Sequence, residues 1–327
     1  MNIFNILKFV GGLALFLYGM NYMGDELKKA GGSKLETLLR KMTDKKIKGL
    51  LFGAIITAII QSSSAVTVMT VGLVNSKLLS LHQAVGIIMG ANIGTTITSW
   101  ILSLTGIQSS NLFISMLKPS VFSPVIAFVG IILLLSGKTE KKKHIGSIML
   151  GFGTLMFGME SMSSAVEPLK NSPGFTSILT LFQNPILGIL AGAFLTAVIQ
   201  SSSASIGILQ ALSMTGSITV LSAFPLILGQ NIGTCITAII SSINTSKNAK
   251  RVSVVHLLFN VIGVIFAAAI FYLMNEIFDL NFVNEKINSA TIAAIHTAFN
   301  IFSTIILFPF GRQIEKLSYL FVPEKRK

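Results

Sequence analysis

Charged residues are scarce in this chain of 327 residues, at 11% of the sequence against the roughly 25% of a typical soluble domain. Its single cysteine, Cys235, permits no internal disulfide, and the sequence has no CxxC motif or Cys/His cluster for a structural metal. Hydrophobic residues reach 52%. These proportions exclude a soluble domain, a disulfide-stabilised fold and thiol redox chemistry, and they indicate a membrane protein.

The excess of basic residues does not indicate nucleic acid. Lys and Arg number 25 against 12 Asp and Glu, but they form short clusters between long apolar runs rather than one surface stripe. Such clusters follow the positive-inside pattern of membrane proteins. We therefore expect a lipid bilayer, and no nucleic acid, as a partner of the chain.

Seven apolar stretches have the length of about 20 residues that a membrane-spanning helix needs. They lie near 3–23, 78–103, 119–137, 145–165, 218–243, 252–275 and 290–310. Two further stretches, 47–75 and 186–214, carry Gln-Ser-Ser-Ser in the middle, where a simple span would be most apolar. We predict that these two are re-entrant hairpins, each of which enters and leaves on the same side.

The loop charges support hairpins at both places. With two hairpins and seven crossings, 21 of the 25 basic residues fall on one side of the membrane. If both stretches crossed instead, the cluster Lys141–Lys143 would lie outside, against the positive-inside rule. The charges therefore predict a multi-pass protein with its N-terminus outside and its C-terminus in the cytoplasm.

The chain contains a duplication. Residues 49–101 align without a gap to 188–240 at a constant offset of 139, with 23 identities in 53 positions. Because the first copy has three crossings, an odd number, the second must be inserted upside down, as in secondary transporters. The predicted parts are a first repeat 1–137 (hairpin 47–75), a basic linker 138–144, a second repeat 145–275 (hairpin 186–214), an extra span 276–310 and a basic cytoplasmic tail 311–327.

The strongest sign of a site is the pair of identical pentapeptides Gln61–Ala65 and Gln200–Ala204. A hairpin tip at bilayer depth exposes free N–H groups at the start of its second helix, and with serine hydroxyls these form an anion site. Small serines also allow close helix packing, but two copies at symmetric positions favour the site. The predicted anion-binding residues are Gln61, Ser62, Ser63, Ser64, Gln200, Ser201, Ser202 and Ser203.

Two glycine-rich segments, Gly90–Thr96 and Gly229–Cys235, form a second pair. Glycines around an Asn and a Thr provide a helix break and oxygen donors that suit Na⁺ or an oxyanion. Close packing with a back-bonded Thr is the alternative, although packing does not require the Asn. The predicted ligands are Asn92 and Asn231 for the anion, and Ser63, Ser64, Thr95, Ser202, Ser203 and Thr234 for Na⁺.

Three further features concern polar groups within the spans. His256 with Asn260 and His296 with Asn300 are spaced by four residues, so each pair shares one helix face. We expect these supporting residues to hold the hairpins by hydrogen bonds, with a proton path as the alternative. Glu160 is the only acid well inside a predicted span, and an acid at that depth is a functional hypothesis by default.

The paired QSSSA motifs, GANIGTT with GQNIGTC, and His-Leu-Leu-Phe-Asn at 256–260 resemble the sodium-dependent phosphate cotransporter family, the type II family with bacterial and animal members. The resemblance covers nearly the whole chain. It implies that the QSSS segments bind phosphate and Na⁺ as transported ligands, with no cofactor, in the plasma membrane (the cytoplasmic membrane of a bacterium). Many bacterial relatives continue into a helical domain resembling the phosphate regulator PhoU, whereas this sequence stops at Lys327 after a basic tail.

We therefore predict an all-α polytopic inverted-repeat secondary transporter that carries phosphate with Na⁺ by alternating access. We take the site to contain no Lys or Arg at membrane depth, so that phosphate carrying one or two negative charges is desolvated against dipoles alone. Na⁺ must then enter with it, and each ligand favours binding of the other.

Two alternatives come from the same residues. Hydroxyl and amide donors also suit sulfate or an organic anion, and the hairpins of an anion channel would form a filter. Uptake that vanishes without Na⁺ distinguishes cotransport from a channel, which conducts without it. A membrane enzyme is disfavoured, because the spans contain no nucleophile beside a base or metal cluster. The sequence leaves the oligomeric state open.

Overall fold

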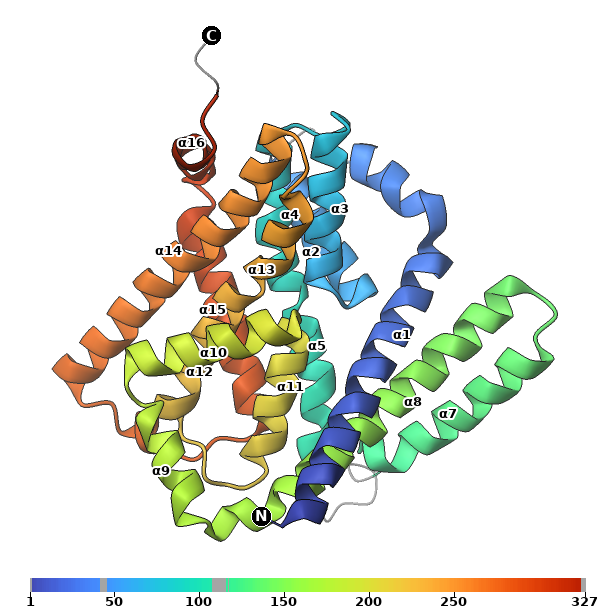
Figure 1. The fold of residues 1–327 in the computed structure, drawn as a ribbon, viewed down its shortest axis with the longest axis vertical. Coiled ribbons are helices and arrows are strands. Elements are labelled where there is room, and N and C mark those ends of the chain that lie inside the picture. The colour runs from blue at the N-terminus through green and yellow to red at the C-terminus, as the bar shows by residue number, and fades with distance from the viewer. Residues whose placement is uncertain (1, 42–45, 108–115, 117, 325–327) are drawn as a thin grey trace.

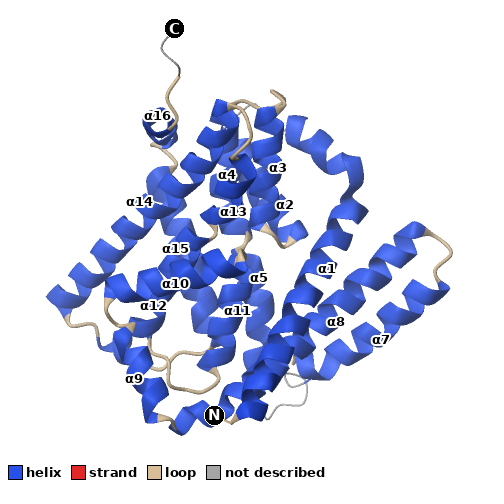
Figure 2. Ribbon diagram, in the orientation of Figure 1, coloured by secondary structure: helices blue, strands red, loops and turns tan. Residues whose placement is uncertain are grey.

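The computed structural model describes residues 2–41, 46–107, 116 and 118–324, and these form helices joined by short loops (Figure 2). The α-helices are α1 Ile3–Lys41, α2 Lys46–Ile60, α3 Ser63–Asn75, α4 Leu81–Gly94, α5 Thr96–Ser103, α7 Pro119–Ser136, α8 Glu140–Val166, α9 Pro173–Leu181, α10 Pro185–Ile199, α11 Ser202–Ser213, α12 Val220–Gly233, α13 Cys235–Ser242, α14 Lys247–Phe278, α15 Ser289–Leu307 and α16 Gly311–Phe321. Short 3₁₀ helices are η1 Leu104–Gly106, η2 Glu167–Asn171 and η3 Asn281–Asn284.

Six segments of the described chain are long and apolar enough to cross a bilayer. They are Ile3–Gly31, Leu81–Gly106, Glu140–Asn171, Val220–Ser242, Lys247–Phe278 and Ser289–Leu307. Helix α7 has 18 residues and runs antiparallel beside α8 (Figure 1), but its apolar part, Val121–Ser136, is shorter than these six segments. The prediction of a polytopic helical membrane protein is confirmed. The two ends of the chain lie at opposite ends of the bundle, as Figure 1 shows and as the predicted seven crossings require.

The two QSSS stretches fold as helical hairpins (Figure 1). Helix α3 runs from its tip toward the end of the bundle that holds the C-terminus, whereas α11 runs from its tip toward the end that holds the N-terminus and α10 lies across the bundle. The helix that leads into α10, α9, is bent by 102° against it, so this pair does not form a straight span. The tips meet in the middle, where Ser64 Oγ lies 3.4 Å from the Gln200 carbonyl oxygen.

Glycines allow the first helix of each hairpin to lie against the long helix that follows the hairpin. A Cβ added at Gly90 would meet the Leu50 carbonyl oxygen, and one at Gly229 would meet the Ile189 carbonyl oxygen. These two contacts are related by the repeat offset of 139. The same close approach is therefore built twice, although the exact repeat boundaries stay a prediction.

Helices α1 and α8 correspond in the duplication and cross each other in the antiparallel sense (Figure 1). A Cβ at Gly12 would lie 2.9 Å from the Gly158 carbonyl oxygen, and one at Gly151 would lie 3.1 Å from that of Gly19. Because Gly151 is Gly12 shifted by 139 and Gly158 is Gly19 shifted by 139, each contact maps onto the other. A local two-fold axis between α1 and α8 produces this pattern.

The apolar core is divided by the hairpin tips. One cluster packs α2, α3 and α4 against α14, and includes Ile87 and Phe259. Another fills the space between α1, α8 and α11 toward the N-terminal end, and includes Phe16, Met156 and Ile208. The tips therefore lie between two apolar regions.

Two segments predicted to lie outside the spanning helices form helices of their own. Helix α9 lies within 166–185, between the predicted span 145–165 and the predicted hairpin 186–214. It begins there because Ser172 Oγ caps it by accepting the Phe175 N–H at 3.4 Å and Pro173 occupies its first position. Helix α16 lies in the predicted basic tail, where Ile314 is buried and supplies an apolar contact. Much of the predicted outer loop 104–118 lies outside the described residues.

Candidate functional site

The two hairpin tips have the same backbone conformation. Gln61 and Gln200 both adopt φ of 61°, the left-handed region that residues with a Cβ seldom occupy. The N–H of each donates to the carbonyl of the Thr four residues earlier at 2.7 Å, which ends the first helix of the hairpin. Such a conformation costs about 1–3 kcal/mol, and conformations of this kind cluster at functional sites.

The second helix of each hairpin begins at a capped serine. Ser62 Oγ accepts the Ala65 N–H at 3.2 Å, and Ser201 Oγ accepts the Ala204 N–H at the same distance. The first-turn N–H groups of α3 and α11 have no acceptor within their own helices. The two partial positive charges at these N-termini therefore face one region from opposite sides.

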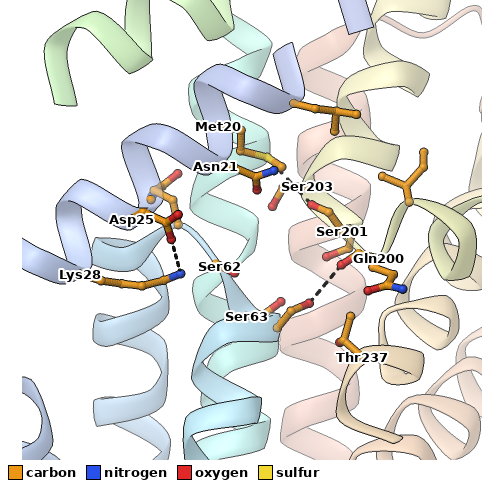
Figure 3. Close-up of a pocket in the computed structure, with 16 residues that line it drawn as sticks. Met20, Asn21, Asp25, Lys28, Ser62, Ser63, Gln200, Ser201, Ser203 and Thr237 are labelled. Carbon is orange, nitrogen blue, oxygen red and sulfur yellow. Dashed lines mark hydrogen bonds and ion pairs between the residues drawn. The ribbon is translucent and has the colours of Figure 1, made fainter. Parts of the chain in front are cut away.

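A cavity of about 350 Å³ lies at these tips (Figure 3). All eight residues of the two QSSS segments line it, as the sequence predicts for a shared site. Ser63 and Ser202 are only 5% and 4% exposed. Ser203 Oγ lies 3.4 Å from Thr95 Oγ1, so one of the predicted Na⁺ residues from the glycine-rich segments contacts a tip.

An ion pair on α1 also lines this cavity. Lys28 Nζ lies 2.8 Å from Asp25 Oδ1, and Figure 3 shows both side chains beside the first tip. Lys28 is the only basic residue among the described residues that line the cavity. The assumption that no Lys or Arg lies at the site is therefore wrong.

Lys28 lies beyond the first predicted span, 3–23, so the apolar pattern alone places it outside the membrane. Helix α1 continues without a break to Lys41 and passes the first tip. A signal was present in the sequence, because Asn21, Gly24, Asp25 and Lys28 lie on one face of a helix at spacings of three and four residues. All four line the cavity.

The cavity continues toward one end of the bundle. A second space of about 470 Å³ shares Lys28, Ser64, Gln200 and Thr237 with it, and extends along α13 to Ser241. Helix α13 leads to the basic start of α14 at Lys247. The site is therefore open toward the end that carries the C-terminus.

The opposite direction is closed by apolar packing. Phe16 is fully buried and lies against α11, where a Cβ added at Gly207 would come within 2.7 Å of the Phe16 ring. Met20 lines the cavity from this side, and its Sδ lies 3.9 Å from Ser201 Oγ. The site is closed toward the end that carries the N-terminus.

Four predicted ligands, Asn92, Thr95, Asn231 and Thr234, do not line the cavity. Asn92 Nδ2 donates to the Ile88 carbonyl at 3.0 Å, and Asn231 Nδ2 donates to the Ile227 carbonyl at 2.9 Å. Thr234 Oγ1 likewise donates to the carbonyl four residues earlier. These side chains bond within their own helices, and the glycines beside them approach the hairpins. This geometry favours the packing alternative for these residues, whereas Thr95 stays near a tip.

The two His/Asn pairs are buried on α14 and α15. In each pair the Asn amide donates to the backbone carbonyl of its His. His296 Nδ1 lies 2.8 Å from Ser99 Oγ on α5, and Asn260 Nδ2 lies 3.4 Å from Cys235 Sγ on α13. In the described part of the chain these side chains connect spanning helices, and none of their hydrogen bonds reaches a hairpin.

Comparison with known proteins identifies the family. The family model described as Na⁺/Pi-cotransporter matches residues 15–164 and 155–283, so one model matches both halves of the chain. The chain belongs to the Na⁺/Pi-cotransporter family. The resemblance found in the sequence motifs is thereby confirmed, and so is the prediction that the chain is a transporter rather than an enzyme.

Curated relatives differ in length and in name. An uncharacterized protein of Bacillus subtilis, YqeW, is 30% identical over 323 residues, which cover 98% of this chain and 99% of the relative. The putative inorganic phosphate export protein YjbB of Escherichia coli is 25% identical over 93% of this chain, which spans only 53% of that relative. A sodium-dependent phosphate transport protein 2A of Rattus norvegicus is 34% identical over 97 residues, 29% of this chain and 15% of the relative. No solved structure matches significantly.

Proposed function

We propose that this protein transports inorganic phosphate together with Na⁺ by alternating access, with the cavity at the hairpin tips as the binding site. The observation that carries the proposal is the convergence of two repeat-related helix N-termini on one cavity lined by serines. Helix N-termini bind phosphate through their free N–H groups and positive dipole ends. Transporters with inverted repeats bind their substrates at such broken helices.

Phosphate would lie between the tips, with Ser63 and Ser202 as hydroxyl donors from opposite sides. The Ser62 and Ser201 hydroxyls already cap their helices, so they shape the tips rather than bind the anion. Lys28 adds a positive charge at the open side of the cavity. Its charge is cancelled by Asp25 in the ion pair at 2.8 Å, so the negative charge of phosphate still requires a cation.

Na⁺ would bind to oxygen atoms beside the same tips. Ser203 Oγ and Thr95 Oγ1 lie 3.4 Å apart and are buried. Gln61 Oε1 is buried and has no hydrogen-bond partner among the described residues. An unpartnered buried oxygen is costly unless a ligand satisfies it. Na⁺ at this place would also neutralise phosphate, which couples the binding of the two ligands.

The closed and open sides of the site support alternating access. With the N-terminus outside and the C-terminus in the cytoplasm, as the loop charges predict, this conformation faces inward. Cysteines at Asn244 and Asn284, in a Cys235→Ser background, test that orientation with a membrane-impermeant thiol reagent. We expect labelling of Asn284→Cys from outside and of Asn244→Cys only after the membrane is opened, and the reverse result contradicts the orientation.

Proteoliposomes test the function directly. We expect uptake of radiolabelled phosphate that requires a Na⁺ gradient and stops when choline replaces Na⁺. Excess unlabelled sulfate should not compete with phosphate, and anion currents should not appear without Na⁺. Competition by sulfate would favour a transporter of another anion, and currents without Na⁺ would favour an anion channel. The Escherichia coli relative is named a putative phosphate export protein. Phosphate export that is independent of Na⁺ would instead give equal transport in Na⁺ and choline buffers. Protein carrying both Ser63→Ala and Ser202→Ala serves as the inactive control.

A further inference from the structure

A separate cavity of about 420 Å³ lies on the closed side of the bundle. It borders η1 at Thr105 and the start of α7 at Lys118. Most of its wall comes from α8 and the turn that follows it. The wall residues are Met156, Glu160, Ser163, Ser164 and Glu167.

The repeat offset relates this wall to the site already described. Subtracting 139 from each of the five residues gives Leu17, Asn21, Gly24, Asp25 and Lys28 of α1. All five line the cavity at the hairpin tips. The match concerns the whole face of a helix, and it agrees with the two-fold axis that the glycine contacts place between α1 and α8.

One residue breaks the correspondence. Met20 lines the cavity at the tips, but its counterpart Met159 lines neither cavity and is fully buried. Met159 belongs to the apolar cluster that also contains Phe16 and closes the site on this side. The second cavity thus reaches the apolar packing but ends before the hairpin tips.

We propose that the second cavity is the opposite entrance of the transport route, and that the α8 wall takes the place of the α1 wall at the tips when the protein opens toward its N-terminal end. In proteins built from inverted repeats, each half adopts in one state the arrangement that the other half has in the other state. Met159 then lines the cavity at the tips, as Met20 does now. This inference rests on the proposed transport function.

The two walls differ in charge. The α8 wall has Glu160 where α1 has Asn21, and Glu167 where α1 has Lys28. Carboxylates attract a cation, so this entrance is suited to load Na⁺, while the Lys28 wall is suited to phosphate. Lys118 at the start of α7 and Lys170 in the turn that also holds Glu167 line the same cavity, so the preference for a cation belongs to Glu160 on α8. Glu160, the acid within a predicted span, thereby acquires a role.

Cysteine labelling tests the entrance. Met159→Cys, in the Cys235→Ser background, is expected to react with an impermeant thiol reagent only from the side that labels Asn284→Cys. Met20→Cys should react from the other side. If the open state is a minor one, populated at about 0.1–10%, the first reaction should be roughly tenfold to a thousandfold slower than the second. Na⁺ and phosphate should change the two rates in opposite directions.

Met162→Cys is the matched control, because Met162 is equally buried on the same helix and lines neither cavity. Labelling of Met162→Cys as fast as Met159→Cys means general loosening of α8 and overturns the proposal. The proposal is also overturned if Met159→Cys does not react with the thiol reagent under any ligand condition in protein that still transports phosphate. If the wild type fails to transport, the proposed function falls, but the sidedness of labelling still decides whether an entrance exists.

Two further variants cover folding failure and charge. If Met159→Cys does not fold, Ser163→Cys on the same wall replaces it. A labelling rate of Ser163→Cys that is the same with and without Na⁺ and phosphate overturns the proposal. Glu160→Gln should raise the Na⁺ concentration for half-maximal transport when Na⁺ is supplied from the Asn284 side, and leave it unchanged from the other side. Unchanged Na⁺ dependence from both sides contradicts the cation-loading role of this wall.

Discussion

The second helices of the two hairpins, α3 and α11, start with the same tip sequence but are held in the bundle by different interactions. In α11, Gln210 Nε2 donates to the backbone carbonyls of Ser99 and Ser289 at 2.9 and 3.0 Å. Ser205 accepts twice, through its Oγ from Thr196 and through its carbonyl from Gln230. Helix α11 is therefore fixed to its neighbours by directional bonds.

Helix α3 has valines at the matching positions. Val71 corresponds to Gln210 and Val66 to Ser205, and both are buried in the apolar cluster between α3, α4 and α14. Thr57 corresponds to Thr196, but its Oγ1 has no hydrogen-bond partner within the described chain. Apolar contacts are non-directional. Of the two hairpins, the first is consequently the one that can shift with fewer bonds broken.

The two copies therefore kept the tips alike, while the support of each tip diverged. The tips keep sequence, φ angle and cap geometry. The helices behind the tips differ, because α11 is held by hydrogen bonds at the positions where α3 is held by apolar contacts. Four experiments test this division, in order of expected effect.

Ser63→Ala and Ser202→Ala test whether the tips are equivalent. A hydrogen bond to a charged ligand contributes roughly 1.5–3 kcal/mol, so each change should weaken phosphate or Na⁺ binding by roughly tenfold to a hundredfold. The melting temperature without ligand should stay unchanged, because the hydroxyl is replaced with little change in volume. Calorimetric titration of phosphate in Na⁺ buffer measures the loss. A defect from only one of the two variants would discard the shared site.

Gln210→Val gives α11 the residue that α3 has at this position. It removes the two buried hydrogen bonds that Gln210 donates, so stability should fall by roughly 1–3 kcal/mol. Thermal unfolding in detergent measures this, with Val71→Leu as the control expected to change stability by less. Equal stability of Gln210→Val and the wild type would mean that hydrogen bonds do not distinguish the two hairpins.

Lys28→Gln tests the charge beside the first tip. The Lys28–Asp25 pair is partly exposed and contributes little to folding, whereas phosphate at the tips would gain a charged donor. We expect phosphate affinity in Na⁺ buffer to fall roughly threefold to tenfold, with an unchanged melting temperature. Lys29→Gln is the matched control, because Lys29 pairs with Glu26 and does not line the cavity. Similar affinities for both variants would remove Lys28 from the site.

Thr196→Val and Thr57→Val produce the smallest expected effects. Thr196 Oγ1 donates to Ser205 Oγ at 2.9 Å, so its loss should cost about 0.6 kcal/mol, the average found for such bonds in membranes. Thr57→Val removes an unpartnered hydroxyl and should leave stability equal or slightly higher. Unfolding curves of the two variants, measured side by side, check the sign. Weaker Na⁺ binding by Thr57→Val would instead make that hydroxyl a ligand.

Much of the architecture followed from local features of the sequence. Span lengths, the positions of the hairpins and the inverted duplication depend on apolar runs, loop charges and a fixed offset, all of which are readable without contacts. The tips were also predictable, because four polar residues at bilayer depth have few physical explanations. Gln61–Ser64 and Gln200–Ser203 accordingly line one cavity.

Side-chain direction was not predictable in the same way. Asn92 and Asn231 have the chemistry of ligands, but the close approach of α2 and α10 at Gly90 and Gly229 leaves these side chains bonded to their own helices. The Thr234 hydroxyl is likewise bonded to a carbonyl of its own helix, that of Gln230. Whether an amide faces a ligand or a carbonyl depends on the packing of the neighbouring helix, and motif spacing carries no information about that packing.

The helical membrane fold, the duplicated tips and the family follow from the amino-acid sequence alone, because hydropathy, charge and identity are properties of the chain. Only the tertiary structure brought Lys28 and Asp25 to the tips, closed one side with Phe16 and opened a second cavity on the wall of Glu160. These features depend on where α1 and α8 cross between the hairpins. The offset of 139 relates the two walls on paper, but which wall faces the tips is a property of one conformation of the packed bundle.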